Sequence, residues 1–151
     1  MYKRIFDITL SSIGIIVLAP LFIIIAIIIK LDSTGGVFFR QERIGKNGRK
    51  FRIFKFRSMA VIQDMDSLKI TVGADKRITK IGHFLRKYKI DELPQLFNVL
   101  LGDMSIVGPR PEVEEYVNHY NQHNKDIVLS IRPGITDLAS IRFRNESDIL
   151  A

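Results

Sequence analysis

Two adjacent carboxylates, Asp91 and Glu92, stand at the expected start of a helix and are the residues best suited to chemistry. Helix starts favour an Asp at the N-cap and a Glu just after it, so the pair could serve the helix alone. A helix N-terminus also stabilises anions, so a carboxylate there stays ionised and can act as a nucleophile or a ligand of Mg²⁺. Two neighbouring carboxylates can divide such tasks between them. The local pattern leaves both interpretations open.

Arg110 lies between Pro109 and Pro111, so the backbone on both sides of it is stiff. A stiff backbone fixes where the guanidinium points, which suits bidentate recognition of a phosphate group. The alternative is an exposed arginine in a proline-rich turn. Three other cations are weaker candidates for phosphate contacts: Arg77, Arg86 and Arg132. Two more, Lys55 and Arg57, are candidates for contacts with phosphate or with a membrane surface.

Several kinds of site are excluded or disfavoured by residue types. The chain has no Cys, which rules out disulfides, thiolate metal sites and cysteine nucleophiles. His119 and His123 have the spacing of a shared helix face but lack an identifiable third ligand, which disfavours a zinc site. No glycine-rich nucleotide loop and no nucleophile-elbow serine is present.

The N-terminal segment contains an apolar run long enough to enter a membrane. No charged residue lies between Asp7 and Lys30, which leaves the 22 residues 8–29 uncharged. As a straight helix this run would measure about 33 Å at roughly 1.5 Å per residue, against a hydrocarbon core of about 30 Å. The run is too long for a typical secretory signal, and no cleavage site of small residues follows it.

Pro20 interrupts this run near its middle, and a proline there bends or breaks a helix. Basic residues stand on both flanks, with Lys3 and Arg4 before the run and Lys30 after it, and the positive-inside bias draws both flanks to the cytoplasm. These features favour a re-entrant helix over residues 1–31 that breaks at Pro20 and returns to the same face. A single kinked span is the competing interpretation.

The chain carries a formal net charge of +7, which suits anionic partners such as phosphates, acidic lipid head groups or nucleic acid. The excess is concentrated in residues 40–57, just after the apolar run, where anionic lipid would attract each charge by about 1 kcal/mol. A nucleic-acid-binding domain is disfavoured, because the apolar run has no place in it and no platform of base-stacking aromatics is evident. The pattern indicates no oligomeric state.

The rest of the chain reads as a small α+β domain over residues 32–151. Two strands joined by a turn at residues 45–48 predict a β-hairpin, and most of its Phe side chains are expected in the core. Thr79 is expected to cap one helix and Asp91 the next, which Gly102 ends. The expected ranges are 37–43 and 51–57 for the strands, 60–71, 80–89, 91–101 and 112–123 for the helices, and 135–141 for a short strand or irregular segment. The predicted fold class is α+β, mostly helical.

These residues resemble the bacterial sugar transferases, also called monotopic phosphoglycosyl transferases. The matching segments run in order along nearly the whole chain, and their combination is far more specific than any one of them. They are the apolar N-terminus with Pro20, FRQERIG at 39–45, FKFRSM at 54–59, DKRIT at 75–79, DELPQL at 91–96, GDMS at 102–105, VGPRP at 107–111 and RPGIT at 132–136.

The resemblance implies transfer of a phosphosugar from a UDP-sugar to a polyprenyl phosphate, with release of UMP, as the first membrane step in building bacterial glycoconjugates. By position, Asp91 would be the nucleophile that forms a covalent phosphosugar intermediate. Glu92 would be the second carboxylate, binding Mg²⁺ with Asp91 or handling protons, and Arg110 would hold phosphate. The N-terminal segment would be the re-entrant membrane helix, at the cytoplasmic face of the bacterial inner membrane.

The sequence departs from the family pattern in three places. Ala19 stands where a serine often precedes the proline, and Asp137 stands where glycine is common. The chain ends at Ala151, where relatives usually continue, so part of the donor pocket is expected to be missing if this is a fragment. The alternative function is a non-catalytic membrane-anchored module that binds acidic lipid or a partner enzyme, for which Asp91 would not be needed.

Overall fold

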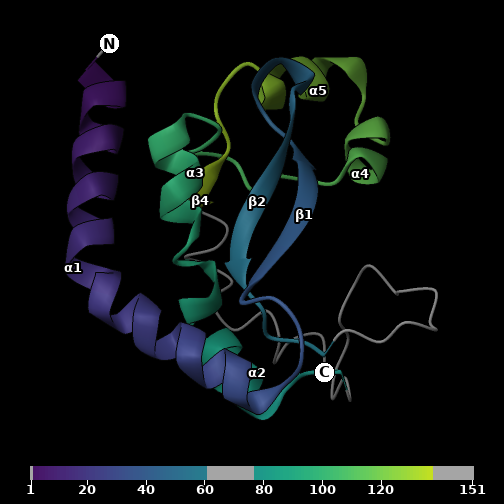
Figure 1. The fold of residues 1–151 in the computed structure, drawn as a ribbon. Helices are drawn as coiled ribbons and strands as arrows, with labels where there is room; N and C mark the ends of the chain where they lie inside the picture. The colour runs from purple at the N-terminus through teal and green to yellow at the C-terminus, as the bar shows by residue number, and fades with distance from the viewer. Residues whose placement is uncertain (1, 61–76, 138–151) are drawn as a thin grey trace.

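A computed structural model describes residues 2–60 and 77–137 of the chain (Figure 1). In these residues a long N-terminal helix precedes a β-hairpin, and short helices and a second small sheet follow. The helices are α1 (Tyr2–Asp32), α2 (Lys80–Lys87), α3 (Gln95–Leu101), α4 (Glu114–Asn118) and α5 (Gln122–Leu129). The strands are β1 (Phe38–Ile44), β2 (Lys50–Phe56), β3 (Ser105–Val107) and β4 (Gly134–Thr136). The predicted class, mostly helical with a small antiparallel hairpin, is confirmed.

Helix α1 is bent rather than interrupted. It is one helix of 31 residues with Pro20 inside it, and Figure 1 shows that it changes direction part-way along. A proline removes one backbone donor and crowds the preceding turn, which bends a helix without ending it. The expected separation into two helices at Pro20 is therefore wrong. The Ser11 hydroxyl donates to the Ile8 carbonyl, within its own turn (3.1 Å).

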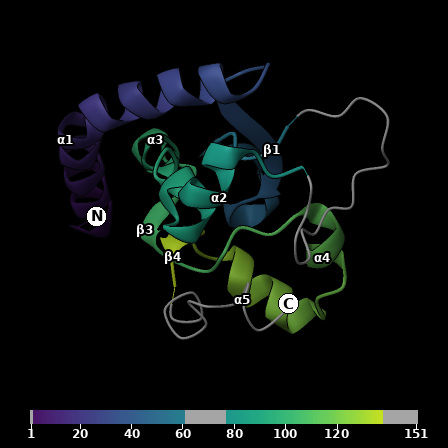
Figure 2. The same ribbon diagram turned by 90° about the horizontal axis from the view of Figure 1, so that it is seen from below.

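Within the described residues, only one side of α1 is covered. Phe22, Ile25 and Ile29 are its buried apolar side chains, whereas large apolar residues along its whole length remain exposed. Figure 2 shows α1 along one side of the molecule, with α4 and α5 on the opposite side. By length and composition α1 is the one described helix able to cross a membrane. Its uncovered face leaves a large apolar surface that is unfavourable in water.

Polar contacts join the N-terminal end of α1 to α3 and β3. Arg4 donates to the carbonyls of Val99 (2.6 Å) and Leu100 (2.9 Å) in the last turn of α3, where carbonyls run short of backbone donors. The buried carboxylate of Asp7 accepts from the Ser105 hydroxyl (2.9 Å) and from the backbone N–H that follows Ser105 (3.1 Å). Charge-assisted bonds of this kind hold the start of α1 against α3 and β3.

The C-terminal end of α1 is tied to the same domain. Arg57 is only 4% exposed and donates to the carbonyls of Ile29, Ser33 and Thr34 at 2.7 to 3.2 Å. The prediction that Arg57 contacts a membrane surface or phosphate is therefore wrong, since this buried guanidinium donates to carbonyls in the last turn of α1 and just beyond it. Asp32 accepts from the N–H of Ile81 (3.2 Å) and so joins α1 to α2.

Strands β1 and β2 form the predicted antiparallel hairpin, with Phe38 opposite Phe56 and Ile44 opposite Lys50. The turn between them places Asn47 and Gly48 at positive φ, the conformation that an Asn-Gly pair tolerates. Phe51 and Phe56 are core residues as expected, but Phe38 and Phe39 are largely exposed. Strands β3 and β4 form a short parallel pair. The sequence predicted neither β3 nor the pairing, only a short strand or irregular segment at 135–141. A Cβ on Gly108 or on Gly134 would collide with the backbone of the other residue. The absence of a side chain at both positions therefore allows the two segments to approach this closely.

The predicted helices are only partly confirmed. Thr79 caps α2 by accepting from the N–H of Gly82 (3.0 Å), as expected. The segment expected as one helix over 112–123 is divided into α4 and α5, because Asn121 caps a new helix there by accepting from the N–H of Asn124 (2.8 Å). The helix expected at 60–71 falls almost wholly outside the described residues.

Two apolar clusters support the site. The first joins the second half of α1 to β2 and α2 through Phe22, Ile25, Ile29, Phe56 and Leu85. The second joins β2 to α3 and the residues before β3 through Phe51, Ile53, Val99 and Met104. Strand β2 contributes to both clusters, so its position relative to α1 and α3 is held on two sides.

Candidate functional site

Asp91 and Glu92 lie in a 3-10 turn, Ile90–Glu92, between α2 and α3 rather than at the N-cap of α3. Helix α3 begins at Gln95, and Pro94 occupies its N-cap. The interpretation that Asp91 caps the helix is therefore wrong. Asp91 is 8% exposed, and its buried Oδ1 has no hydrogen-bond partner among the residues the structure describes. Burying a carboxylate oxygen without a partner is unfavourable, so this arrangement is not explained by stability.

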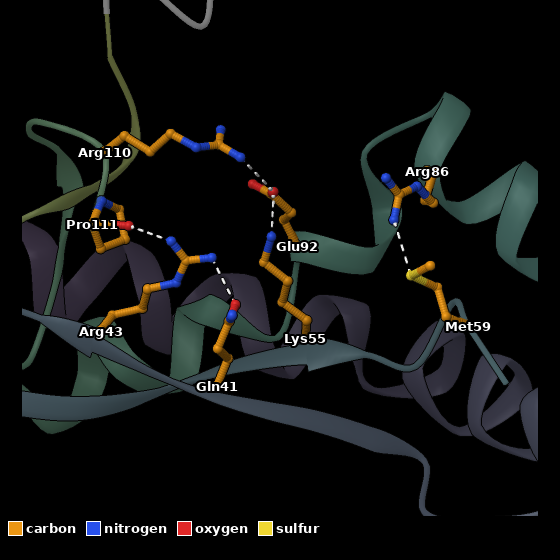
Figure 3. Close-up of polar contacts among 8 residues, drawn as sticks. All are labelled: Gln41, Arg43, Lys55, Met59, Arg86, Glu92, Arg110 and Pro111. Atoms are coloured by element: carbon orange, nitrogen blue, oxygen red, sulfur yellow. Dashed lines mark hydrogen bonds and ion pairs between the residues drawn. The ribbon is translucent and has the colours of Figure 1, made fainter. Parts of the chain in front are cut away.

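Glu92 faces two cations (Figure 3). Its Oε1 accepts from Lys55 Nζ at 2.8 Å, and the Arg110 guanidinium lies 3.8 Å away. Lys55 and Glu92 are both mostly shielded from solvent, whereas Arg110 is about half exposed. Lys55 comes from β2, Glu92 from the turn before α3, and Arg110 from the loop after β3. The structure thus gathers three of the predicted site residues from three segments.

The surroundings shift the pKa values of the two carboxylates in opposite directions. Burial raises the pKa of Asp91 above its usual range, aided by the charge of Glu92 and opposed by Lys55 and Arg86. Burial by itself would raise the pKa of Glu92, but the charge and hydrogen bond of Lys55, together with Arg110, lower that pKa below its usual value. Neighbouring carboxyl groups whose pKa values are driven apart are typical of active sites that give them different tasks.

Arg43 is a member of the site that sequence reasoning missed (Figure 3). It donates to the Pro111 carbonyl (3.2 Å) and to Gln41 Oε1 (2.7 Å), and its buried Nε has no partner among the described residues. Burial lowers the pKa of this arginine, an effect that nearby Arg110 adds to and Glu112 opposes. The sequence showed Arg43 only as one cation in a basic stretch.

A small cavity of about 10 Å³, room for about one water, lies between these side chains. Its lining includes Arg43, Lys55, Glu92, Gln95 and Arg110, so three cations surround one carboxylate. Such an excess of positive charge favours an anionic group at the mouth of the cavity.

Two of the other predicted phosphate ligands, Arg132 and Arg77, lie away from the carboxylate pair. Arg132 donates through Nε to the carbonyl of Gly102 (2.8 Å) and lines a second cavity, separate from the one at Glu92. Arg77 lies just before α2 and lines neither cavity; its carbonyl accepts from the N–H of Ala60. Arg86, a weaker candidate from the sequence, is close enough to Asp91 for its charge to lower the pKa of that carboxyl, and it contacts Met59 (Figure 3).

Asn98 holds the two sides of the site in register. It is fully buried in α3, where its Oδ1 accepts from the N–H of Phe54 (2.8 Å) and its Nδ2 donates to the carbonyl of Arg52 (3.0 Å). Both backbone groups belong to β2, one on each side of Ile53. The side-chain amide thereby fixes α3 to the strand that carries Lys55, and the spacing of Lys55 from Glu92 depends on this bond.

The carboxylates fit a magnesium ion better than a metal that needs a full set of protein ligands. Over residues 2–60 and 77–137, no group of three or more His, Asp or Glu side chains could hold a metal. Mg²⁺ needs only one or two carboxylates when substrate phosphates and water complete its shell. Asp91 has a free oxygen for that purpose, while one oxygen of Glu92 is engaged by Lys55.

Comparison with known proteins agrees with the resemblance seen in the motifs. The family model of the bacterial sugar transferases matches residues 1–150. The UDP-glucose:undecaprenyl-phosphate glucose-1-phosphate transferase of Klebsiella pneumoniae is 42% identical over 153 residues, covering 99% of this chain and 33% of that protein. The exopolysaccharide production protein PSS of Rhizobium leguminosarum bv. phaseoli is 46% identical over 151 residues, covering 93% of this chain and 73% of that protein.

A third relative, the UDP-N-acetylgalactosamine-undecaprenyl-phosphate N-acetylgalactosaminephosphotransferase of Aeromonas hydrophila, is 43% identical over 141 residues. Those residues cover 92% of this chain and 33% of the relative. The chain therefore spans about a third of the length of two of these proteins and about three quarters of the other. With a family match over 150 of its 151 residues, the chain belongs to the bacterial sugar transferase family.

Proposed function

We propose that this chain transfers a phosphosugar from a UDP-sugar to a polyprenyl phosphate, through a covalent bond to Asp91. The observation that carries the proposal is the buried Oδ1 of Asp91, which has no hydrogen-bond partner among the described residues. Its neighbour Glu92 faces Lys55 and Arg110. The names of the relatives from Klebsiella and Aeromonas, which specify undecaprenyl phosphate and UDP-sugars, support this substrate pair. The same reaction would begin the assembly of a bacterial polysaccharide.

The first step would be attack by Asp91 Oδ1 on the β-phosphorus of the donor. A P–O bond to aspartate forms, the bond to the bridging oxygen breaks, and UMP leaves with that electron pair. Burial disfavours the ionised form of Asp91, and bonding to phosphorus removes that charge, so the environment that raises its pKa also favours the reaction. In the second step a phosphate oxygen of the polyprenyl phosphate attacks the same phosphorus and releases Asp91.

The neighbouring residues would bind and orient the phosphates. Arg110 and Arg43 would contact phosphate oxygens at the mouth of the small cavity, and Lys55 would share its charge between Glu92 and the donor. Glu92, kept ionised by Lys55, suits a metal ligand better than a proton donor. A Mg²⁺ ion held by Asp91 and Glu92 would neutralise charge on the diphosphate.

The test of this function is the intact mass of the detergent-purified protein after incubation with Mg²⁺ and a panel of UDP-sugars. A mass increase equal to one phosphosugar is expected, and it should disappear on adding polyprenyl phosphate. If UMP is released with polyprenyl phosphate present while no adduct forms even after rapid quenching, the covalent step is wrong and direct transfer takes its place.

The rate of adduct formation should depend on pH through Asp91. Attack requires the ionised carboxylate, and burial raises its pKa above the ordinary value of 3.8. The rate is therefore expected to fall as pH drops through a pKa higher than that of an exposed aspartate. A rate profile from pH 4 to pH 8 checks this, and a rate that stays flat down to about pH 4 would contradict a buried nucleophile.

We further propose that α1 lies re-entrant in the cytoplasmic face of the bacterial inner membrane. Its first two turns bond to α3 and β3, and its last turn bonds to Arg57, which follows β2, and to α2, so both ends contact one domain. A helix that spanned the bilayer would place its ends on opposite sides, and one small domain could not bind both. The exposed apolar face of the bent helix would then lie in lipid.

Cysteine labelling in sealed membrane vesicles tests this topology. The chain has no native Cys, and Tyr2 (85% exposed) and Leu31 (82% exposed) stand at the two ends of α1. Tyr2→Cys and Leu31→Cys should both react with an impermeant reagent from the cytoplasmic side alone. Labelling of the two variants from opposite sides would establish a span instead.

A further inference from the structure

A second and larger cavity lies at the far end of α3 from the carboxylate pair. Its volume is about 320 Å³, within the range of small-ligand pockets. It shares no lining residue with the cavity at Glu92: Gln95, at the start of α3, lines the first, and Gly102, just past its end, lines the second. These residues are separated by about 10 Å at roughly 1.5 Å per helical residue. The turn between β1 and β2 forms the opposite wall.

The lining of this cavity is strongly cationic. Four cations, Lys46, Arg49, Lys50 and Arg132, stand there with one carboxylate, Asp103. Lys50 is paired with Glu114 (2.6 Å) and Glu42 (3.2 Å), but the side chains of Lys46 and Arg49 have no hydrogen bond or ion pair among the residues described.

Only one of the donor nitrogens of Arg132 is bonded to a described residue, and that bond orients its guanidinium. Its Nε donates to the Gly102 carbonyl, which fixes the guanidinium plane at the cavity wall, and no described residue pairs with its terminal nitrogens. An oriented guanidinium with free N–H groups matches the oxygens of a phosphate. Lys46, Arg49 and Arg132 share the cavity lining with a single carboxylate, Asp103, so their like charges repel and a bound anion relieves that repulsion.

The cavity also lies beside the start of α1. Gly102 is so close to Arg4 that a Cβ on this glycine would stand 3.2 Å from Arg4 Nη2. The first turns of α1 carry exposed apolar side chains, among them Ile5, Phe6 and Ile8. If these enter lipid, the cavity opens at the level of the phospholipid phosphates.

We propose that this cavity is a second phosphate-binding site, distinct from the site at Asp91, with Lys46, Arg49 and Arg132 as its ligands. The ligand is a phosphate-bearing anion. An anionic phospholipid head group is the source that the neighbouring start of α1 favours, and free phosphate offers the same chemistry.

The test uses the full chain in phosphatidylcholine nanodiscs, with the backbone amide NMR signals of residues 45–49 as the readout. One arm adds inorganic phosphate, and the other replaces a tenth of the lipid with phosphatidylglycerol. The variant is Lys46→Ala with Arg49→Ala. The matched control is Lys80→Ala with Lys87→Ala, which removes two exposed cations of α2 that line neither cavity.

The wild type and the control should respond, and the Lys46/Arg49 variant should bind at least about tenfold more weakly. A response to phosphatidylglycerol alone assigns the site to lipid head groups, and a response to inorganic phosphate assigns it to free anions. Equal weakening in both variants would mean that net charge alone attracts the anion, and no response of these amides in either arm would overturn the site. Since Lys46 and Arg49 are exposed and their side chains make no hydrogen bond or ion pair with the described residues, folding should be kept, and Arg49→Gln provides a milder second variant.

Discussion

Replacing Asp91 by asparagine should abolish formation of the phosphosugar adduct and reduce transfer by at least about a thousandfold. An amide is nearly the same size as the carboxylate but cannot attack phosphorus as an anion. The measurement is intact mass together with UMP release, with Asp126→Asn as the matched control. Asp126 is exposed on α5 and lines neither cavity, so its replacement should leave the adduct intact.

The same Asp91 variant should fold at least as well as the wild type at neutral pH. Because burial raises the pKa of Asp91 in the folded state, its ionised form lowers folding stability as pH rises through that pKa. Asparagine removes this cost. If Asp91→Asn kept full turnover, the nucleophile assignment would be wrong, and if it unfolded the protein, the destabilising effect of the buried carboxylate would be contradicted. Retention of membrane binding in this variant separates catalysis from anchoring.

Replacing Lys55 by methionine should reduce transfer by about a hundredfold or more and lower the free energy of unfolding by about 1–3 kcal/mol at pH 7. Glu92 would lose its closest partner while remaining largely buried, so its pKa should rise. A carboxyl group with a lowered folded pKa contributes stability above its unfolded pKa and loses it as pH falls through the folded value. The destabilisation of the variant should therefore shrink in acid.

Two further variants distinguish the role of Lys55 in stability from its role in catalysis. Lys55→Met combined with Glu92→Gln removes the unpaired buried charge, and it should recover much of the stability while transfer stays low. Lys50→Met, which breaks an exposed pair with Glu42 and Glu114, should change neither property measurably. Urea unfolding and UMP release measure both effects. Full activity in Lys55→Met would remove Lys55 from the site.

Local sequence rules predicted those features that depend on neighbouring residues. The apolar run of residues 8–29, the hairpin turn at Asn47-Gly48 and the Thr79 cap each follow from residue types a few positions apart. They are confirmed because the interactions behind them act within one helix or one turn. The same rules were wrong for Asp91, since a 3-10 turn after Lys89 at positive φ delays the start of α3 to Gln95.

Contacts between distant segments were decided by the tertiary structure alone. Lys55 meets Glu92 because Asn98 and the two apolar clusters hold β2 against α3, and no periodic pattern signals a polar pair 37 residues apart. Arg43 joined the site and Arg132 was placed at the other cavity for the same reason. The sequence by itself determined that this chain carries a carboxylate pair, a constrained arginine and a membrane-seeking helix. Which cations face the carboxylates, and that both ends of α1 bind one domain, depended on packing over long separations, which local propensity does not encode.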